Sequence, residues 1–133
     1  MITTLTRLAP HALSLLRVMA ALLLMQHGTQ KLLGFPDFLP GGRGAPAMFS
    51  LSWTAGVFEL VGGLLLAIGL FTRPVAFVLS GVMAFAYFLV HAGREFYPIN
   101  NGGELAALYC FVFFYFVFSG PGPWSVDRAM GRA

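Results

Sequence analysis

The sequence predicts an all-α fold, an integral membrane four-helix bundle with up-down-up-down topology. The first observation is composition: 58% of the 133 residues are hydrophobic and only 10% are charged. A soluble domain has about 25% charged residues, so this chain has too few to cover a surface that faces water. The second observation is that the apolar residues form four segments, each close to the ~20 residues needed to cross a bilayer. The length fits one domain over residues 1–133.

The predicted membrane helices follow from these apolar segments in order. The first covers about residues 8–33 and contains the polar sequence HGTQK, and a loop rich in glycine and proline follows it. The second covers about residues 53–71, and the very short turn at 72–74 makes it an antiparallel hairpin with the third, at about residues 75–91. A polar loop then leads to the fourth helix, at about residues 104–119, which is dense in aromatic residues.

The basic residues predict that both termini lie in the cytoplasm. With four spans, the termini and the turn at 72–74 share one side of the membrane, which carries four arginines against three basic residues on the other. Cytoplasmic loops carry an excess of Lys and Arg, so the side with four arginines is expected to be the cytoplasmic one. We expect the protein to lie in the bacterial inner membrane. The basic residues are scattered singly, and no basic run predicts a nucleic-acid partner. The four arginines are Arg7, Arg73, Arg128 and Arg132.

The cysteine and histidine residues exclude two kinds of redox site. Cys110 is the single cysteine, so the chain forms neither an intramolecular disulfide nor a Cys-x-x-Cys pair. No His-x-x-x-His spacing is present, and we predict no metal site. His27 and His91 could meet as axial haem ligands between helices, but two histidines are a weak signal and we do not expect haem.

The predicted topology brings ionisable residues from all four helices to the outer half of the bundle. His27 and Lys31 are four residues apart and share a helix face, and Glu59 lies at the same depth in the second helix. His91 ends the third helix at this side, and Glu104 begins the fourth. A buried acid needs a partner, and Lys31 or His27 is the nearest to Glu59 by depth. The cluster is either a structural salt-bridge network or a polar pocket that handles protons or a polar head group.

Three polar residues away from this cluster are structural ion-pair candidates: Arg17, Arg73 and Asp127. Arg17 lies ~15 Å closer to the cytoplasmic side than the cluster. It either extends to the membrane surface or pairs with Asp127, which follows the fourth helix. Charged residues inside membranes are commonly paired, so we favour a structural pairing over a catalytic role.

Several stretches of the chain together resemble one family. They are LLRVMAALLLMQHGTQKLLGF, FELVGGLLLAIGLFTRPVA, HAGREF with NGGELAALY, and GPGPWSVD. With these stretches the chain resembles the DoxX family of small four-helix membrane proteins over nearly its whole length. The resemblance implies a relation to the small subunits of thiosulfate:quinone oxidoreductase and to thiol and oxidative-stress systems. The family's recurrent polar positions correspond to Arg17, His27, Gly28, Lys31, Glu59, Arg73, Glu104 and Asp127.

The leading functional hypothesis is a membrane component of a quinone-linked oxidoreductase system. Quinone reduction takes two electrons and two protons, so the site needs proton donors beside an apolar slot. The sequence has no flavin or iron–sulfur motif, so the electrons would come from a partner subunit, a bound cofactor or a small substrate. A non-enzymatic scaffold or assembly factor is the alternative, in which the ion pairs are structural. A small-solute transporter or channel, formed as a homo-oligomer, is the third hypothesis.

Overall fold

The computed structural model describes residues 2–37 and 44–132, and every regular element within these ranges is a helix. Two of the longer rods change locally from α-helix to π-helix without a break in the chain. The elements are α1 (Ile2–Leu33), α2 (Leu51–Val57), η1 (Phe58–Gly62), α3 (Gly63–Ile68), α4 (Thr72–Ala86), η2 (Tyr87–His91), α5 (Pro98–Asn101), α6 (Glu104–Ser119) and α7 (Val126–Ala129).

Three rods are long and apolar enough to cross a membrane, which confirms the prediction of long apolar helices. They cover Thr3–Leu33, Leu51–Ile68 and Thr72–His91, and the shorter apolar helix α6 adds 16 residues. The second rod ends before the predicted limit at 71, because Gly69 takes the left-handed conformation (φ 70°) that commonly terminates a helix. The number of spans and their direction through the bilayer stay predictions.

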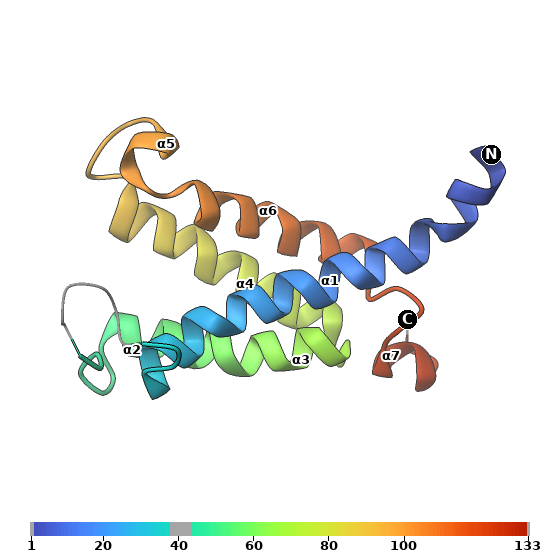
Figure 1. The fold of residues 1–133 in the computed structure, drawn as a ribbon, viewed down its shortest axis with the longest axis horizontal. Helices are drawn as coiled ribbons and strands as arrows, with labels where there is room; N and C mark the ends of the chain where they lie inside the picture. Colours follow the sequence, from blue (N-terminus) through green and yellow to red (C-terminus); the bar gives the residue numbers. More distant parts are fainter. Residues whose placement is uncertain (1, 38–43, 133) are drawn as a thin grey trace.

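The rods form two antiparallel pairs. The first pair is α1 with α2–η1–α3, and the second is α4–η2 with α6 (Figure 1). Both termini and α7 lie at one end of the molecule, whereas α5 and the end of α1 lie at the other (Figure 1). We call these the termini end and the α5 end. The elements that carry the predicted polar cluster all reach the α5 end.

The core between the pairs is apolar, and the outer surface is apolar as well. Fully buried side chains include Leu24, Leu79 and Phe113. Large side chains on the outer faces of α4 and α6 remain exposed, with Phe85 at 70% and Phe111 at 72%. An apolar surface of this extent marks a membrane-facing or protein-binding region, and helices of this length and hydropathy place it against lipid.

Small residues allow α1 to lie close against the second rod. A Cβ atom on Gly28 would come within 2.7 Å of the backbone nitrogen of Leu60, and one on Gly63 within 2.5 Å of Met25 Cγ. Close backbone approach through small residues is the usual packing mode of membrane helices. It places the polar residues at the end of α1 directly beside η1.

Candidate functional site

The centre of the candidate site is an ion pair between α1 and η1. The Nζ atom of Lys31 lies 2.7 Å from Oε1 and 2.9 Å from Oε2 of Glu59. The Glu59 side chain is only 5% exposed and that of Lys31 17%. The sequence predicted either Lys31 or His27 as the partner of Glu59, and in the structure the partner is Lys31.

A cavity of about 280 Å³ lies beside this ion pair. It is formed between the two helix pairs at the α5 end, so that α1, η1, α4, η2 and α6 all contribute to its wall. Its polar side chains share the space with leucine and methionine side chains. The lining residues with side chains larger than that of alanine are Leu24, His27, Lys31, Glu59, Met83, His91, Leu105 and Tyr109.

Both π-helical segments supply an ionisable side chain to the cavity. Glu59 is the second residue of η1, and His91 is the last residue of η2. A π-helical turn widens the helix locally and changes the direction of the side chains around it. Such turns are rare and are frequently found at functional sites. Here they occur in the two rods that face each other across the cavity.

His91 is oriented by the loop that follows it. Its Nδ1 atom lies 3.0 Å from the backbone oxygen of Asn101, so Nδ1 is the protonated nitrogen that donates. Asn101 is itself held in place, since its side chain donates to the backbone oxygen of Glu95 and accepts from the backbone nitrogen of Gly103. The Nε2 atom of His91 has no hydrogen-bond partner within residues 2–37 and 44–132, which leaves it available to a ligand.

His27 contributes a second imidazole to the cavity wall. Neither of its ring nitrogens has a hydrogen-bond partner in the described part of the chain. Its place next to Lys31 on the same face of α1 follows from their helical spacing. The cavity therefore contains two imidazoles with uncommitted nitrogens and one ion pair.

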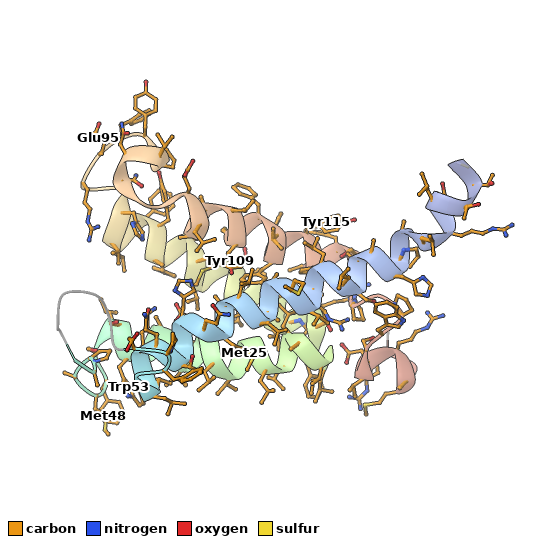
Figure 2. All side chains as sticks on the ribbon, viewed as in Figure 1. Met25, Met48, Trp53, Glu95, Tyr109 and Tyr115 are labelled. Atoms are coloured by element: carbon orange, nitrogen blue, oxygen red, sulfur yellow. The ribbon has the colours of Figure 1, made fainter. Side chains whose placement is uncertain are left out.

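Tyr109 belongs to the cavity, although the sequence did not single it out. It is 6% exposed, stacks on Phe113 at 5.3 Å between ring centroids, and lines the cavity from α6. Figure 2 shows it on the inner side of α6, facing α1. Within the aromatic run of the fourth helix, the one available signal was its hydroxyl group, because buried tyrosines usually place that group against a polar partner.

Glu104 lies outside the cavity, and its expected place there was wrong. It is exposed and lines a separate groove with Pro98, Leu108 and Phe111. Glu104 and Tyr109 are five residues apart, which separates them by about 140° around an α-helix. Since Tyr109 faces the core, Glu104 points away from it. Its position in the first turn of α6 still favours a negative charge.

The expected ion pair between Arg17 and Asp127 is not formed. Arg17 is completely buried, and its guanidinium donates to the backbone oxygens of Pro121, Trp124 and Ala67. The segment after α6 folds back beside α1 and presents its carbonyl groups to the guanidinium. These acceptors replace a carboxylate, and they attach the C-terminal segment to the helix bundle.

Asp127 instead caps the beginning of α4. Its carboxylate oxygens accept from the backbone nitrogens of Phe71 at 2.9 Å and Thr72 at 2.8 Å. Burial alone would raise the pKa of Asp127, but these two N–H groups, together with the Thr72 side chain and the charge of Arg132, hold the pKa below its ordinary value. The charge also lies at a helix N-terminus, where it is favourable.

Arg73 makes no ion pair within the described residues either. Its Nη1 atom donates to the backbone oxygens of Val117 and Phe118, at 2.7 Å each. These are carbonyl groups of the last turn of α6, where a cation satisfies the free acceptors of the helix end. Arg17, Arg73 and Asp127 thus all act on backbone groups at the termini end.

Comparison with known proteins places the chain in a family. Residues 12–92 match the DoxX family. The chain belongs to this family. An uncharacterized protein of Haemophilus influenzae is 50% identical over 122 residues, which cover 90% of each chain. An uncharacterized membrane protein of Mycobacterium tuberculosis is 29% identical over 137 residues, covering 92% of this chain and 83% of that one. No solved structure shows significant similarity.

The match to the DoxX family covers most of the cavity. It runs from α1 to the end of η2 and includes His27, Lys31, Glu59 and His91, whereas Tyr109 lies beyond it. The cavity of this DoxX protein offers an ammonium group, a carboxylate, two imidazoles and a phenol. The ammonium and phenol groups and the protonated imidazole nitrogens can donate hydrogen bonds to a ligand oxygen, and the carboxylate and the unprotonated imidazole nitrogens can accept protons. Within the described residues, no group of three His, Cys, Asp or Glu side chains is arranged to hold a metal.

Proposed function

We propose that this DoxX protein is a membrane component of a quinone-linked oxidoreductase system, and that its cavity binds the quinone ring. The observation that supports this is one cavity of about 280 Å³ that combines acid–base side chains with leucine and methionine walls. A quinone ring needs both, because its faces are apolar and its two oxygens take up protons when it is reduced. When bound, a quinone accepts two electrons, which would come from a partner protein or a small reduced substrate.

In this proposal the chain supplies hydrogen bonds and protons to the two ring oxygens. Lys31 donates from Nζ to one oxygen while it stays paired with Glu59. His91 donates from Nδ1 to Asn101, so its neutral ring accepts through Nε2 from the hydroxyl group of the reduced quinone, and it donates to the oxygen of the oxidised ring only when the imidazole carries a second proton. His27 and Glu59 take up and deliver the protons that each turnover requires. Leu24 and Met83 enclose the ring and exclude water.

The proposal includes an orientation in the inner membrane. We propose four spans, α1, α2–η1–α3, α4–η2 and α6, with both termini in the cytoplasm. Support comes from the termini end, where α1 begins, α7 lies and α3 turns into α4 (Figure 1), and which carries Arg7, Arg73, Arg128 and Arg132. The cavity then lies in the outer half of the bundle.

Purification of the whole protein in mild detergent tests the proposed function. Lipid extraction should yield quinone, and a short-chain ubiquinone or menadione should bind in a calorimetric titration. Lys31→Met should weaken that binding about tenfold or more, since a hydrogen bond from a charged group contributes about 1.5–3 kcal/mol, and His91→Phe should weaken binding of the reduced quinone by about two- to tenfold, since a neutral hydrogen bond contributes about 0.5–1.5 kcal/mol. Arg94→Gln, an exposed change at the same end, is the matched control. Absence of quinone, of quinone binding and of a redox partner would contradict the proposal.

One observation favours a scaffold as the second candidate function. The Lys31–Glu59 pair joins α1 directly to η1, and an ion pair in this position can serve helix association alone. In a scaffold the double variant Lys31→Met with Glu59→Gln would regain the yield that each single variant loses, and no variant would bind quinone. In the redox protein the double variant would regain stability but not quinone binding.

A further inference from the structure

A second and larger cavity lies at the termini end, far from the ion pair. It measures about 550 Å³ and is formed between the first half of α1, the last turn of α6 and the segment that leads to α7. Ala9 and Leu13 line it from α1, Tyr115 from α6, and Arg128 from α7. Most of its wall is thus aliphatic, aromatic or proline, with one cationic side chain at its edge.

The charge around this cavity is strongly positive. The termini end carries five arginines, namely Arg7, Arg17, Arg73, Arg128 and Arg132, and one acidic side chain, Asp127. The carboxylate of Asp127 is occupied by the backbone of Phe71 and Thr72, and the structure gives it no ion pair with a described arginine. Its negative charge acts on Arg17 and Arg132 and offsets part of the positive charge, but the five arginines outnumber it.

The arginine side chains of the termini end differ in their interaction partners. Arg17 and Arg73 donate to backbone carbonyls, and Arg132 lies over the Phe71 ring at 5.6 Å. The Arg128 side chain has no hydrogen-bond partner or ion pair in the described part of the chain, and it lines the cavity. Behind the Pro121 wall, the Nε atom of Arg17 is buried without an acceptor. Among the arginines of this end, Arg128 is thus the one that both lines the cavity and has a side chain without a partner in the described residues.

We propose that this cavity binds an anionic phospholipid, with the phosphate at Arg128 and an acyl chain along Leu13 and Tyr115. An acyl chain can lie on an apolar wall without loss of hydration, whereas a free hydrated anion would lose its water there without replacement. The lining has no Asp or Glu that could bind the ammonium group of a zwitterionic lipid. Basic pockets beside membrane helices on the cytoplasmic side are typical sites for anionic head groups. The inference does not depend on the quinone proposal, but the cytoplasmic location of this end rests on the orientation proposed above.

Lipid exchange on the whole, delipidated protein tests this inference. We expect micelles that contain phosphatidylglycerol to raise Tm more than micelles with phosphatidylcholine, and phosphatidylglycerol to remain bound in native mass spectra. Arg128→Gln should lower phosphatidylglycerol binding about fivefold, the contribution of one basic residue near an anionic lipid surface. Arg94→Gln removes the same charge at the α5 end and should leave the binding unchanged.

A second variant tests the acyl-chain part of the cavity without changing charge. Ala9 is exposed to the cavity, so Ala9→Trp should fill it and lower lipid retention while Arg128 stays in place. Equal stabilisation by the two lipids would overturn the inference, as would equal behaviour of Arg128→Gln and Arg94→Gln. Full stabilisation by inorganic phosphate alone would also overturn it, because the site would then be an anion site and not a lipid site.

Discussion

Replacing Lys31 by methionine should destabilise the protein more than replacing Glu59 by glutamine, although both changes break the same ion pair. The reason is the unequal burial of the two side chains, since Glu59 is 5% exposed and Lys31 17%. Lys31→Met leaves a carboxylate enclosed between α1 and η1. Glu59→Gln leaves an ammonium group on a long side chain near the end of α1, which can extend toward the membrane surface.

The magnitude follows from the cost of an unpaired buried charge. Removing one partner of a buried pair costs about 3–5 kcal/mol, and we expect Lys31→Met to fall in this range. Glu59→Gln keeps an amide oxygen that still accepts from Nζ, so about 1–2 kcal/mol is expected. The double variant has neither charge, and it should be more stable than the sum of the single losses by about 2–3 kcal/mol.

Reversible unfolding in mixed micelles of mild detergent and sodium dodecyl sulfate measures these differences, with tryptophan fluorescence as the signal. The cycle needs the parent protein, both single variants and the double variant, and Arg94→Gln should change the free energy of unfolding by less than about 0.5 kcal/mol. A coupling energy below about 0.5 kcal/mol, or a reversed order of the single variants, would refute the reasoning.

Three further predictions concern the termini end and the helix contacts. Because the folded state lowers the pKa of Asp127, its contribution to stability is complete above about pH 4 and is lost as pH falls through the lower pKa, so Asp127→Asn should flatten acid unfolding curves there. Gly28→Ala should cost about 1–3 kcal/mol in the same unfolding assay, whereas Gly81→Ala, which meets open space, should not destabilise. Arg17→Met leaves buried carbonyls without donors, so limited proteolysis should release the C-terminal segment much faster.

The depth of a residue along its helix could be predicted from the sequence. Lys31 and Glu59 meet because both lie at a known number of residues from the same loop, and the rise of a helix is regular. His91 reached the same cavity for the same reason. Composition and apolar runs were sufficient to indicate the helices themselves, because few other structures satisfy the backbone in lipid.

The rotation of a helix about its axis could not be predicted in the same way. In α6 nearly every residue is apolar, so no periodic pattern distinguishes the face that packs on α4 from the face that meets lipid. Glu104 was therefore placed in the cavity and Tyr109 was not, whereas the structure reverses the two. The π-helical turns at Glu59 and His91 have no sequence signal that we could use.

Partners of the buried charges were predictable only where the partner is another side chain. For Arg17, the predicted side-chain partner was Asp127, the acidic residue that follows the fourth helix. The actual acceptors are the backbone carbonyls of Pro121, Trp124 and Ala67. Every residue has a backbone carbonyl, so the sequence does not indicate which ones accept these hydrogen bonds. Likewise the carboxylate of Asp127 accepts from backbone nitrogens that become available only because α4 begins beside it.

Buried polar groups therefore have different partners at the two ends of the molecule, and this difference supports the proposed site at the α5 end. At the termini end, Arg17 donates to three backbone carbonyls and Asp127 accepts from two backbone nitrogens, so these two buried groups hold the chain in place, and the exposed Arg128 is the group proposed to meet a ligand there. At the α5 end, His27 and His91 keep nitrogens without partners in the described part of the chain, beside an ion pair that can accept a further hydrogen-bond partner. Half-buried acid–base groups without partners inside a membrane bundle are costly unless they are used. This supports the proposal that a ligand which exchanges protons binds at the α5 end.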